Sequence, residues 1–300
     1  MKQSLTYYLT LLVVKLKGIK RNFSRNPIDF NKIRKEDVKK PSNRFFKKNI
    51  LRTFKIADSL ITEIGLDKNS DNLLIFIHGG AFISGPAQHH WDTVKEIAKK
   101  TNYKIWMCDY PKAPENQINR ISENIDAIYI SALKTHQENH ISIIGDSVGG
   151  TLITALIQRL IMNKIKLPAK IILVSPVMDA SMTNPEIETF DKIDPMLSKT
   201  GVLSAKKMCA GKRNLKDQII SPLYGDFEGF PKTILILAQN DIMYPDAKLA
   251  EIKMRKYNVN IEVIEGNNMP HIWPFLPVMK EANTCLNRII QIIKTNHNNN

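Results

Sequence analysis

Cysteine is scarce in this sequence of 300 residues, and it occurs at no metal-binding or redox spacing. The three cysteines, Cys108, Cys209 and Cys285, are odd in number and form no C-x-x-C pair. This pattern argues against a disulfide framework and against a cysteine-ligated metal, and it fits a reducing compartment. We therefore expect a cytoplasmic protein.

Recognisable cofactor motifs are absent as well. The sequence contains neither G-x-x-x-x-G-K nor G-x-G-x-x-G, the glycine patterns that hold nucleotide phosphates. His136 and His140 stand four residues apart, but Glu138 comes one position too late for the zinc motif H-E-x-x-H. We therefore expect no nucleotide cofactor, and we expect His136 and His140 to belong to a solvated helix end and not to a metal site.

Long hydrophobic runs are also missing. The longest candidate, residues 5–14, is about ten residues long and is followed by Lys15 and Lys17, whereas a transmembrane helix needs about 20 apolar residues. Lys2 and the apolar run 7–14 have the order of a signal peptide, but no small-x-small cleavage site follows them. The sequence favours a cytoplasmic protein, with a secreted or peripheral membrane protein as the alternative.

Acidic residues are rare at the start of the chain. Residues 1–55 hold 16 Lys and Arg against 3 Asp and Glu, a net charge of +13, while the whole chain carries +14. The basicity therefore belongs to an N-terminal segment, which we expect to be helical over residues 1–50. The basic run contains few aromatic residues and no nucleic-acid-binding fold signature, so we expect no specific nucleic-acid partner.

Within this basic segment, residues 1–22 repeat apolar side chains every three to four positions, which predicts an amphipathic helix. The apolar positions are Leu5, Tyr8, Leu9, Leu12, Val13 and Leu16. We expect this face to pack over the rest of the protein. The alternative is an interfacial helix attracted to anionic lipid, with the basic run 15–55 behind it.

From about residue 51, short apolar runs alternate with helical patterns. The expected strands are residues 52–57, 61–64, 73–78, 104–108, 141–144, 170–174, 233–237 and 260–264, and the expected helices are residues 91–100, 117–134, 151–162, 246–257 and 278–294. This alternation predicts an α/β fold, with a mostly parallel central sheet and helices on both faces. Residues 176–221 are too long for an ordinary connection, so we expect a main domain over residues 51–300 that carries an inserted subdomain at about 179–215.

The most informative motif joins one of these strands to the following helix. Gly145-Asp-Ser147-Val-Gly149 matches G-x-S-x-G, the nucleophile elbow of the α/β-hydrolase fold. In such a turn the glycines permit the sharp bend, the serine hydroxyl is exposed, and the N–H of Val148 begins a helix. We take Ser147 as the candidate nucleophile. A glycine-rich turn whose serine merely caps the helix is the alternative for the pentapeptide alone.

A nucleophilic serine needs a base and a group that orients the base. On this fold they follow later strands in the order serine, acid, histidine. Asp241 lies in the loop after strand 233–237, and His271 follows strand 260–264. We expect Asp241 to be the acid, with Asp246 or Glu265 as alternatives, and we expect Asp246 to cap the next helix.

The transition state of acyl transfer also needs N–H groups that stabilise an oxyanion. His78-Gly-Gly-Ala-Phe82 follows strand 73–78, where α/β-hydrolases place the HGGG-type loop. We assign the N–H groups of Gly79, Gly80 and Val148 to this role. His78 itself is expected to be structural.

Together these segments resemble the bacterial hormone-sensitive-lipase-like esterases of the α/β-hydrolase fold. The segments are 78–82, 109–115, 145–150, 174–179, 194–198, 221–226 and the loops that carry Asp241 and His271, and the likeness covers about residues 70–290. The sequence has HGGA in place of the usual HGGG, so Ala81 cannot adopt every glycine conformation. The usual Tyr-Arg-Leu-Ala-Pro-Glu reads Tyr-Pro-Lys-Ala-Pro-Glu here, a difference that does not touch the triad.

The resemblance implies hydrolysis of carboxylic esters with short to medium acyl chains, through a covalent acyl-enzyme at Ser147. It also implies a cap over the acyl pocket, built from the N-terminal segment 1–50 and the insertion at about 179–215, and it implies no metal or organic cofactor. Phe82, Met243 and Trp273 are expected to line the pocket. A serine peptidase or amidase on the same fold is one alternative, and a small-molecule receptor is another. The sequence leaves the oligomeric state open, with a homodimer among the alternatives.

Overall fold

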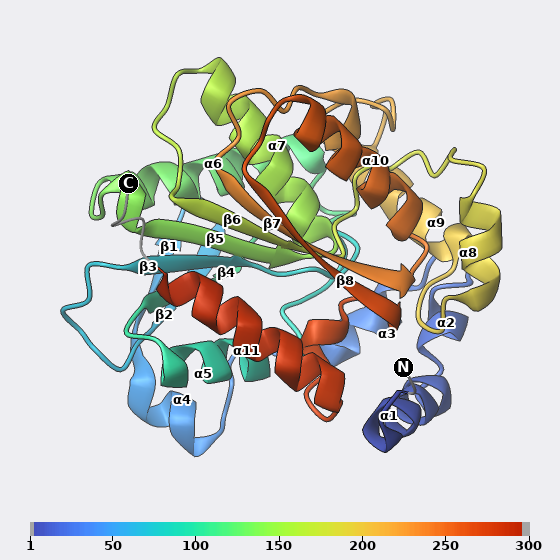
Figure 1. Ribbon diagram of the computed structural model, residues 1–300, viewed down its shortest axis with the longest axis horizontal. Coiled ribbons are helices and arrows are strands. Elements are labelled where there is room, and N and C mark those ends of the chain that lie inside the picture. Colours follow the sequence, from blue (N-terminus) through green and yellow to red (C-terminus); the bar gives the residue numbers. More distant parts are fainter. Residues whose placement is uncertain (1–2, 296–300) are drawn as a thin grey trace.

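The structure is a computed structural model, and it describes residues 3–295. A twisted sheet of eight strands in the order β1-β2-β4-β3-β5-β6-β7-β8 forms the centre of the molecule (Figure 1). The strands are β1 Ile50–Ile56, β2 Ser59–Ile64, β3 Leu73–Ile77, β4 Lys104–Asp109, β5 Ile141–Asp146, β6 Lys170–Val174, β7 Lys232–Asn240 and β8 Ile261–Pro270. Strand β2 runs antiparallel to its two neighbours, β1 and β4. The strands β4, β3, β5, β6, β7 and β8 all run parallel to one another, so the predicted α/β class is confirmed.

Helices cover both faces of this sheet. The α-helices are α1 Leu5–Leu16, α2 Ile19–Asn22, α3 Phe30–Ile33, α4 Arg44–Asn49, α5 Gln88–Lys100, α6 Ile118–Leu133, α7 Val148–Met162, α8 Ile187–Ile193, α9 Lys199–Ala210, α10 Tyr244–Lys256 and α11 Lys280–Lys294. Helices α6, α7 and α10 lie on one face, and α5 and α11 lie on the other (Figure 1).

The alternation of side chains along each strand explains these two layers. On β3, Leu73, Ile75 and Ile77 belong to the hydrophobic cluster on the α6–α7–α10 side. Leu74 and Phe76 belong to the cluster on the α5–α11 side. All five side chains are buried, as expected for a parallel strand that is covered on both faces.

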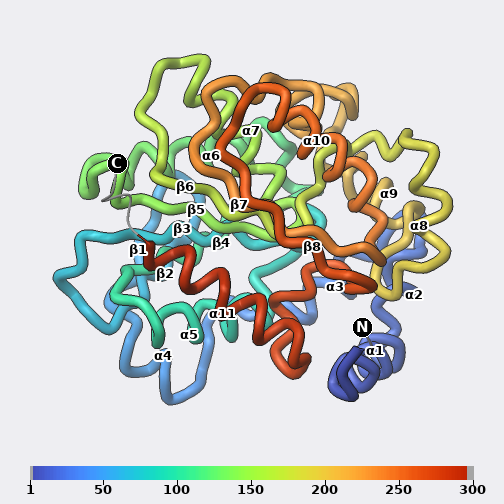
Figure 2. The backbone as a smooth tube through the Cα atoms, viewed as in Figure 1, coloured from blue at the N-terminus to red at the C-terminus, as the bar shows by residue number. Residues whose placement is uncertain are grey.

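Helix α4 packs beside α5, where Phe46 contacts Trp91, whereas α1, α2, α3, α8 and α9 gather beyond the carboxyl ends of β7 and β8 (Figure 1). The chain between β6 and β7 leaves the sheet and forms α8 and α9 beside the N-terminal helices α2 and α3 (Figure 2). Lys20 Nζ donates to the carbonyl oxygen of Asp194 at 2.7 Å, and the N–H of Ile28 donates to Ser204 Oγ at 3.0 Å. These contacts join the N-terminal segment to the insertion.

Helix α1 lies with its predicted apolar face outward. The expectation that this face packs over the protein is wrong: Leu5, Tyr8, Leu9, Leu12, Val13 and Leu16 are all exposed. The side chains that anchor the helix are Tyr7 and Val14, which lie on its opposite side and are each 5% exposed. No helix within residues 3–295 is long and apolar enough to cross a membrane.

Candidate active site

The candidate nucleophile sits in a strained turn between β5 and α7. Ser147 has φ 51° and ψ −122°, in the left-handed half of backbone space that non-glycine residues seldom occupy. Its N–H donates to the carbonyl oxygen of Val174 on β6 at 2.8 Å, which holds the turn against the sheet. The helix begins at Val148, three residues earlier than the sequence pattern suggested.

Glycine is required on both sides of this serine. A Cβ atom on Gly145 would lie 2.6 Å from the carbonyl oxygen of Ile77, and one on Gly149 would lie 2.1 Å from the same oxygen. Both distances are far inside van der Waals contact, and the atom met is backbone that cannot move aside. The G-x-S-x-G spacing is therefore a packing requirement between β3, β5 and α7.

The candidate acid and base meet at the ends of two neighbouring strands. Asp241 directly follows β7 and His271 directly follows β8, and these two strands pair in parallel. His271 Nδ1 lies 2.7 Å from Asp241 Oδ2, and the N–H of Met243 donates to Asp241 Oδ1 at 2.9 Å. The carboxylate is thus fixed by the backbone on one side and orients the imidazole on the other.

The two alternative acids are engaged elsewhere. Asp246 lies in the first turn of α10 and accepts a hydrogen bond from Asn184 Nδ2 at 2.8 Å. It is not the cap of that helix, because the helix already begins at Tyr244. Glu265 accepts a hydrogen bond from Gln239 Nε2 at 2.9 Å and another from the hydroxyl of Tyr244.

His271 is buried, and two opposing effects act on its pKa. Burial would lower the pKa because it disfavours the charged ring, but the adjacent Asp241 carboxylate outweighs burial and raises the pKa above its usual 6.5. A histidine base whose pKa is raised in this way is well matched to proton transfer near neutral pH.

A second buried carboxylate supports the acid loop from the insertion. Asp194 accepts hydrogen bonds from the N–H groups of Met196 and Leu197 on one oxygen and from the N–H of Ile242 on the other, at 2.7–2.9 Å. Burial first, and then the charge of Asp241, raise the pKa of Asp194 to about 7. The sequence marked Asp194 only as part of a family-like segment, and its contact with the acid loop is long-range.

The oxyanion loop differs from the prediction at one position. The N–H of Gly79 already donates to Asp146 Oδ1 at 3.0 Å, so Gly79 is removed from the predicted donors. Among the hydrogen bonds described for residues 3–295, none uses the N–H of Gly80 or Ala81, and both residues line the cavity beside Ser147. Val148, at the first position of α7, lines it too.

Both residues that follow Gly79 have positive φ, 118° for Gly80 and 54° for Ala81. The backbone at Gly80 also passes so close to the carbonyl of Ser84 that a Cβ would lie 2.3 Å from that oxygen. Ala81 has the positive φ that costs a residue with a side chain about 1–2 kcal/mol. The alanine that replaces the third glycine of HGGG therefore fits this loop.

A buried pair behind the loop holds Asp146 in place, and the sequence reasoning missed it. His90 Nδ1 accepts the N–H of Ala87 at 2.9 Å, so in the neutral ring the proton is on Nε2, which lies 3.3 Å from Asp146 Oδ2. Burial would raise the pKa of Asp146, but His90 and the N–H of Gly79 lower it to about 2. His78 also supports the loop, since its ring stacks on the ring of Tyr110 with 4.4 Å between the ring centroids.

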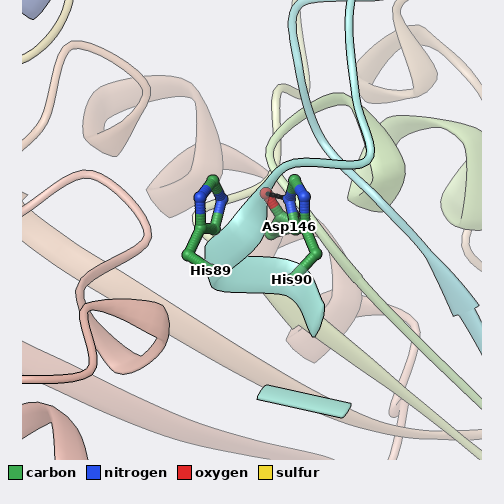
Figure 3. A group of neighbouring side chains, drawn as sticks. All are labelled: His89, His90 and Asp146. Atoms are coloured by element: carbon green, nitrogen blue, oxygen red, sulfur yellow. Dashed lines mark hydrogen bonds and ion pairs between the residues drawn. The ribbon is translucent and has the colours of Figure 1, made fainter. Parts of the chain in front are cut away.

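His89, His90 and Asp146 lie close enough together to resemble a metal site (Figure 3). The hydrogen bonds argue against one, because Nδ1 of His90 accepts a backbone N–H and its Nε2 donates to Asp146. Burial and the neighbouring His90 lower the pKa of His89 to about 3. The group is better described as a carboxylate that is hydrogen-bonded to one buried histidine, with a second histidine beside it.

Ser147, His271 and the oxyanion loop line one cavity of about 880 Å³, which is within the range of small-molecule sites. Met243 lines it as predicted, whereas Phe82 and Trp273 do not. Phe82 is fully buried in the core, and Trp273 points to the α5–α11 side of the sheet, where its indole N–H donates to the carbonyl of Leu237. Both aromatic side chains were predicted to line the pocket, but each packs in one of the two hydrophobic layers of the core.

The insertion and the N-terminal segment both contribute residues to the lining of this cavity. Met196, Leu197 and Val202 are apolar, buried and in the lining. Lys206 on α9 also lines it, and its Nζ lies 3.2 Å from the carbonyl oxygen of Asp179. Burial lowers the pKa of Lys206 to about 8.

Comparisons with known proteins agree with this geometry. A family model described as the alpha/beta hydrolase fold matches residues 74–275. An esterase of Acinetobacter venetianus is 29% identical over 247 residues, which cover 77% of this chain and 78% of that protein. Esterase LipU of Mycobacterium tuberculosis is 27% identical over 208 residues, which cover 67% of each.

Solved structures show the same fold. A proposed esterase from Staphylococcus aureus has a TM-score of 0.85 and 27% identity, and the match covers 94% of this chain and 99% of that one. An esterase from the bacterial hormone-sensitive lipase family has a TM-score of 0.87 and 22% identity, with 99% of both chains covered. The two relatives from Acinetobacter and Mycobacterium are both named as esterases. The chain therefore belongs to the family that the matching model describes as the alpha/beta hydrolase fold.

Proposed function

We propose that this protein hydrolyses carboxylic esters with short to medium acyl chains through an acyl-enzyme at Ser147. The observation that carries the proposal is the 2.7 Å contact between His271 Nδ1 and Asp241 Oδ2, at a cavity that Ser147 and His271 both line. The names of the relatives, which are esterases, agree with this reaction class.

In the first half of the reaction, Ser147 Oγ attacks the ester carbonyl while His271 Nε2 takes the hydroxyl proton. Asp241 holds the imidazole in the tautomer that leaves Nε2 free to accept this proton, and it stabilises the imidazolium that forms. The negative oxygen of the tetrahedral intermediate accepts hydrogen bonds from the N–H groups of Gly80, Ala81 and Val148. Each such donor typically contributes about 3–4 kcal/mol to the transition state.

The intermediate then collapses, the bond to the alcohol oxygen breaks, and His271 gives its proton to the leaving alcohol. A water molecule attacks the acyl-enzyme in the second half, with His271 again acting as base, and a carboxylic acid is released while Ser147 is restored. The cycle uses no metal and no organic cofactor.

The cavity suggests how the substrate lies. Met196, Leu197, Val202 and Met243 offer apolar side chains beside Ser147, and an acyl chain would be stabilised there by burial of its methylene groups, at about 0.8 kcal/mol each. We infer that α8 and α9 act with the N-terminal helices as the cap over this acyl site.

The test measures initial rates on p-nitrophenyl acetate, butyrate, octanoate and palmitate for the wild type and Ser147→Ala. We expect a serine-dependent rate that is highest at acetate to octanoate and low at palmitate. Ser122→Ala is the matched control, because this buried hydroxyl in α6 has no hydrogen-bond partner among residues 3–295. Wild-type turnover by Ser147→Ala, or no turnover of any ester, would refute the proposal.

A further inference from the structure

The outer face of α1 is an apolar surface to which the proposed reaction assigns no role. Half of this twelve-residue helix consists of large apolar side chains that face solvent. Their exposed fractions are 76% for Leu5, 56% for Tyr8, 47% for Leu9, 51% for Leu12, 52% for Val13 and 77% for Leu16. A contiguous apolar face of this kind on a water-soluble protein marks an interaction surface.

The helix is fixed in this orientation by polar contacts on its inner side. Ser4 bonds to both carboxylate oxygens of Glu281, with distances of 2.7 Å from its N–H and 2.8 Å from its hydroxyl. The hydroxyl of Tyr7 donates to the carbonyl of Asn268 at 2.9 Å, and Thr6 Oγ1 accepts the N–H of Lys280 at 3.0 Å. The outward apolar face is therefore part of the folded structure.

The charge beside this face has one sign. Between residues 3 and 28 the sequence contains five Lys and Arg and no acidic residue. Lys15, Lys17 and Arg21 are exposed next to the apolar positions. A helix with an apolar face and flanking cations is the pattern of a helix that lies in the interface of an anionic bilayer.

The same face reaches the mouth of the active-site cavity. Leu9 and Val13 of α1 line the cavity, as do Lys17 and Val278, and Val278 is itself 67% exposed. A surface on which α1 rests would therefore meet the opening that leads to Ser147.

We propose that α1 docks this protein on an anionic lipid bilayer, with its apolar face in the headgroup region and its lysines on the lipid charges. The charge complementarity selects an anionic bilayer as the occupant, because a second copy of this chain would oppose the same cations. A further consequence, which rests on the proposed function, is that lipophilic esters pass from the bilayer into the cavity without crossing water.

The test uses the full chain with Ser147→Ala, so that no substrate is consumed, and sediments it with vesicles of phosphatidylcholine, with or without phosphatidylglycerol. We expect at least tenfold stronger binding to the anionic vesicles. Lys15→Gln with Lys17→Gln should weaken that binding at least tenfold, since each cation near an anionic surface contributes about fivefold. Lys47→Gln with Lys48→Gln, on α4, is the charge-matched control and should bind normally.

The apolar contribution is tested with Leu12→Ser and Leu16→Ser, which lie outside the cavity lining. We expect at least a tenfold loss of vesicle binding, while Leu66→Ser with Leu249→Ser, at two exposed leucines elsewhere, leaves binding unchanged. Equal binding to neutral and anionic vesicles, or normal binding by the α1 variants, would overturn the proposal. So would self-association that Leu12→Ser and Leu16→Ser abolish in a protein that binds no vesicles.

The two proposals fail separately. With active enzyme, Leu12→Ser and Leu16→Ser should keep the rate on soluble p-nitrophenyl butyrate and lose at least tenfold on a long-chain ester embedded in anionic vesicles. Vesicle binding without ester hydrolysis would refute the proposed function and leave the docking surface standing. Ester hydrolysis without vesicle binding would refute the docking proposal and leave the proposed function standing.

Discussion

Asp146 provides the sharpest test of how the oxyanion loop is held. Asn has nearly the same shape as Asp, so Asp146→Asn changes charge and hydrogen bonding with little change in packing. The amide oxygen of Asn can still accept the Gly79 N–H. Its NH₂ group, however, then faces Nε2 of His90, which also carries a proton because Nδ1 accepts the N–H of Ala87.

The expected size follows from the unpaired donor, because leaving a buried donor without an acceptor costs about 1–3 kcal/mol. The lowered pKa of Asp146 has the matching sign, since it shows that the folded protein favours the ionised carboxylate. We therefore expect Asp146→Asn to lower the free energy of unfolding at pH 7 by about 2 kcal/mol.

The pH dependence follows from the direction of the shift. A carboxylate with a lowered pKa in the folded state contributes its full stabilisation above the unfolded pKa of 3.8, and loses it as the pH falls toward 2. The stability difference between wild type and Asp146→Asn should be constant from pH 5 to 7 and should shrink below about pH 4.

Urea unfolding followed by tryptophan fluorescence measures these stabilities. Asp71→Asn, at an exposed position before β3, is the control and should leave stability within about 0.5 kcal/mol. In a His90→Ala background the same Asp146→Asn change should cost about 1–2 kcal/mol less, since the mismatched donor is gone. Equal stability of Asp146→Asn and wild type, or additive effects in this cycle, would refute the assigned hydrogen bonds.

Three further predictions concern the triad, the elbow and the pocket. The rate of ester hydrolysis should rise with pH through a midpoint above 6.5, because His271 must be neutral to act as base and its pKa is raised. Asp241→Asn should lower this midpoint and reduce kcat about 10³–10⁴-fold. Both effects are measured by pH–rate profiles. Gly149→Ala should destabilise the protein by more than about 3 kcal/mol, because its Cβ would lie 2.1 Å from the oxygen of Ile77, and wild-type urea unfolding would contradict this. Met243→Trp should narrow the cavity and lower the ratio of octanoate to acetate rates at least tenfold, and an unchanged ratio would remove Met243 from the acyl site.

The parts of the site that are local in sequence could be predicted from sequence. The G-x-S-x-G turn was readable because strand, turn and helix are consecutive, and the structure shows that Ile77 leaves no room for a side chain at Gly145 or Gly149. Asp241 and His271 could be predicted because each lies in the loop after an expected strand, in the chain order serine, acid, histidine. In a parallel sheet the carboxyl ends of neighbouring strands meet.

The predictions that were wrong or missing concern contacts between residues that lie far apart in the chain. Nothing near Gly79 reveals that its N–H is taken by Asp146, 67 residues later. Phe82 and Trp273 follow catalytic motifs and look like pocket residues, but the layer that each enters depends on the whole sheet. The position of Asp194 against Ile242 likewise depends on how the insertion folds back.

The apolar face of α1 shows a different limit of prediction from sequence. The spacing of apolar residues predicted the helix correctly, but periodicity cannot say what an apolar face contacts. Tyr7 and Val14 carry the packing from the opposite side, and only the structure distinguishes the two orientations.

The central claim is that Ser147 is the nucleophile in a site built by His271 and Asp241. The most direct measurement is the mass of the intact protein after treatment with a fluorophosphonate, with the labelled peptide mapped and the residual esterase rate recorded. We expect one adduct per chain, on Ser147, with esterase activity lost in proportion to labelling, and no adduct in Ser147→Ala. An adduct on another residue, or full labelling with activity retained, would contradict it.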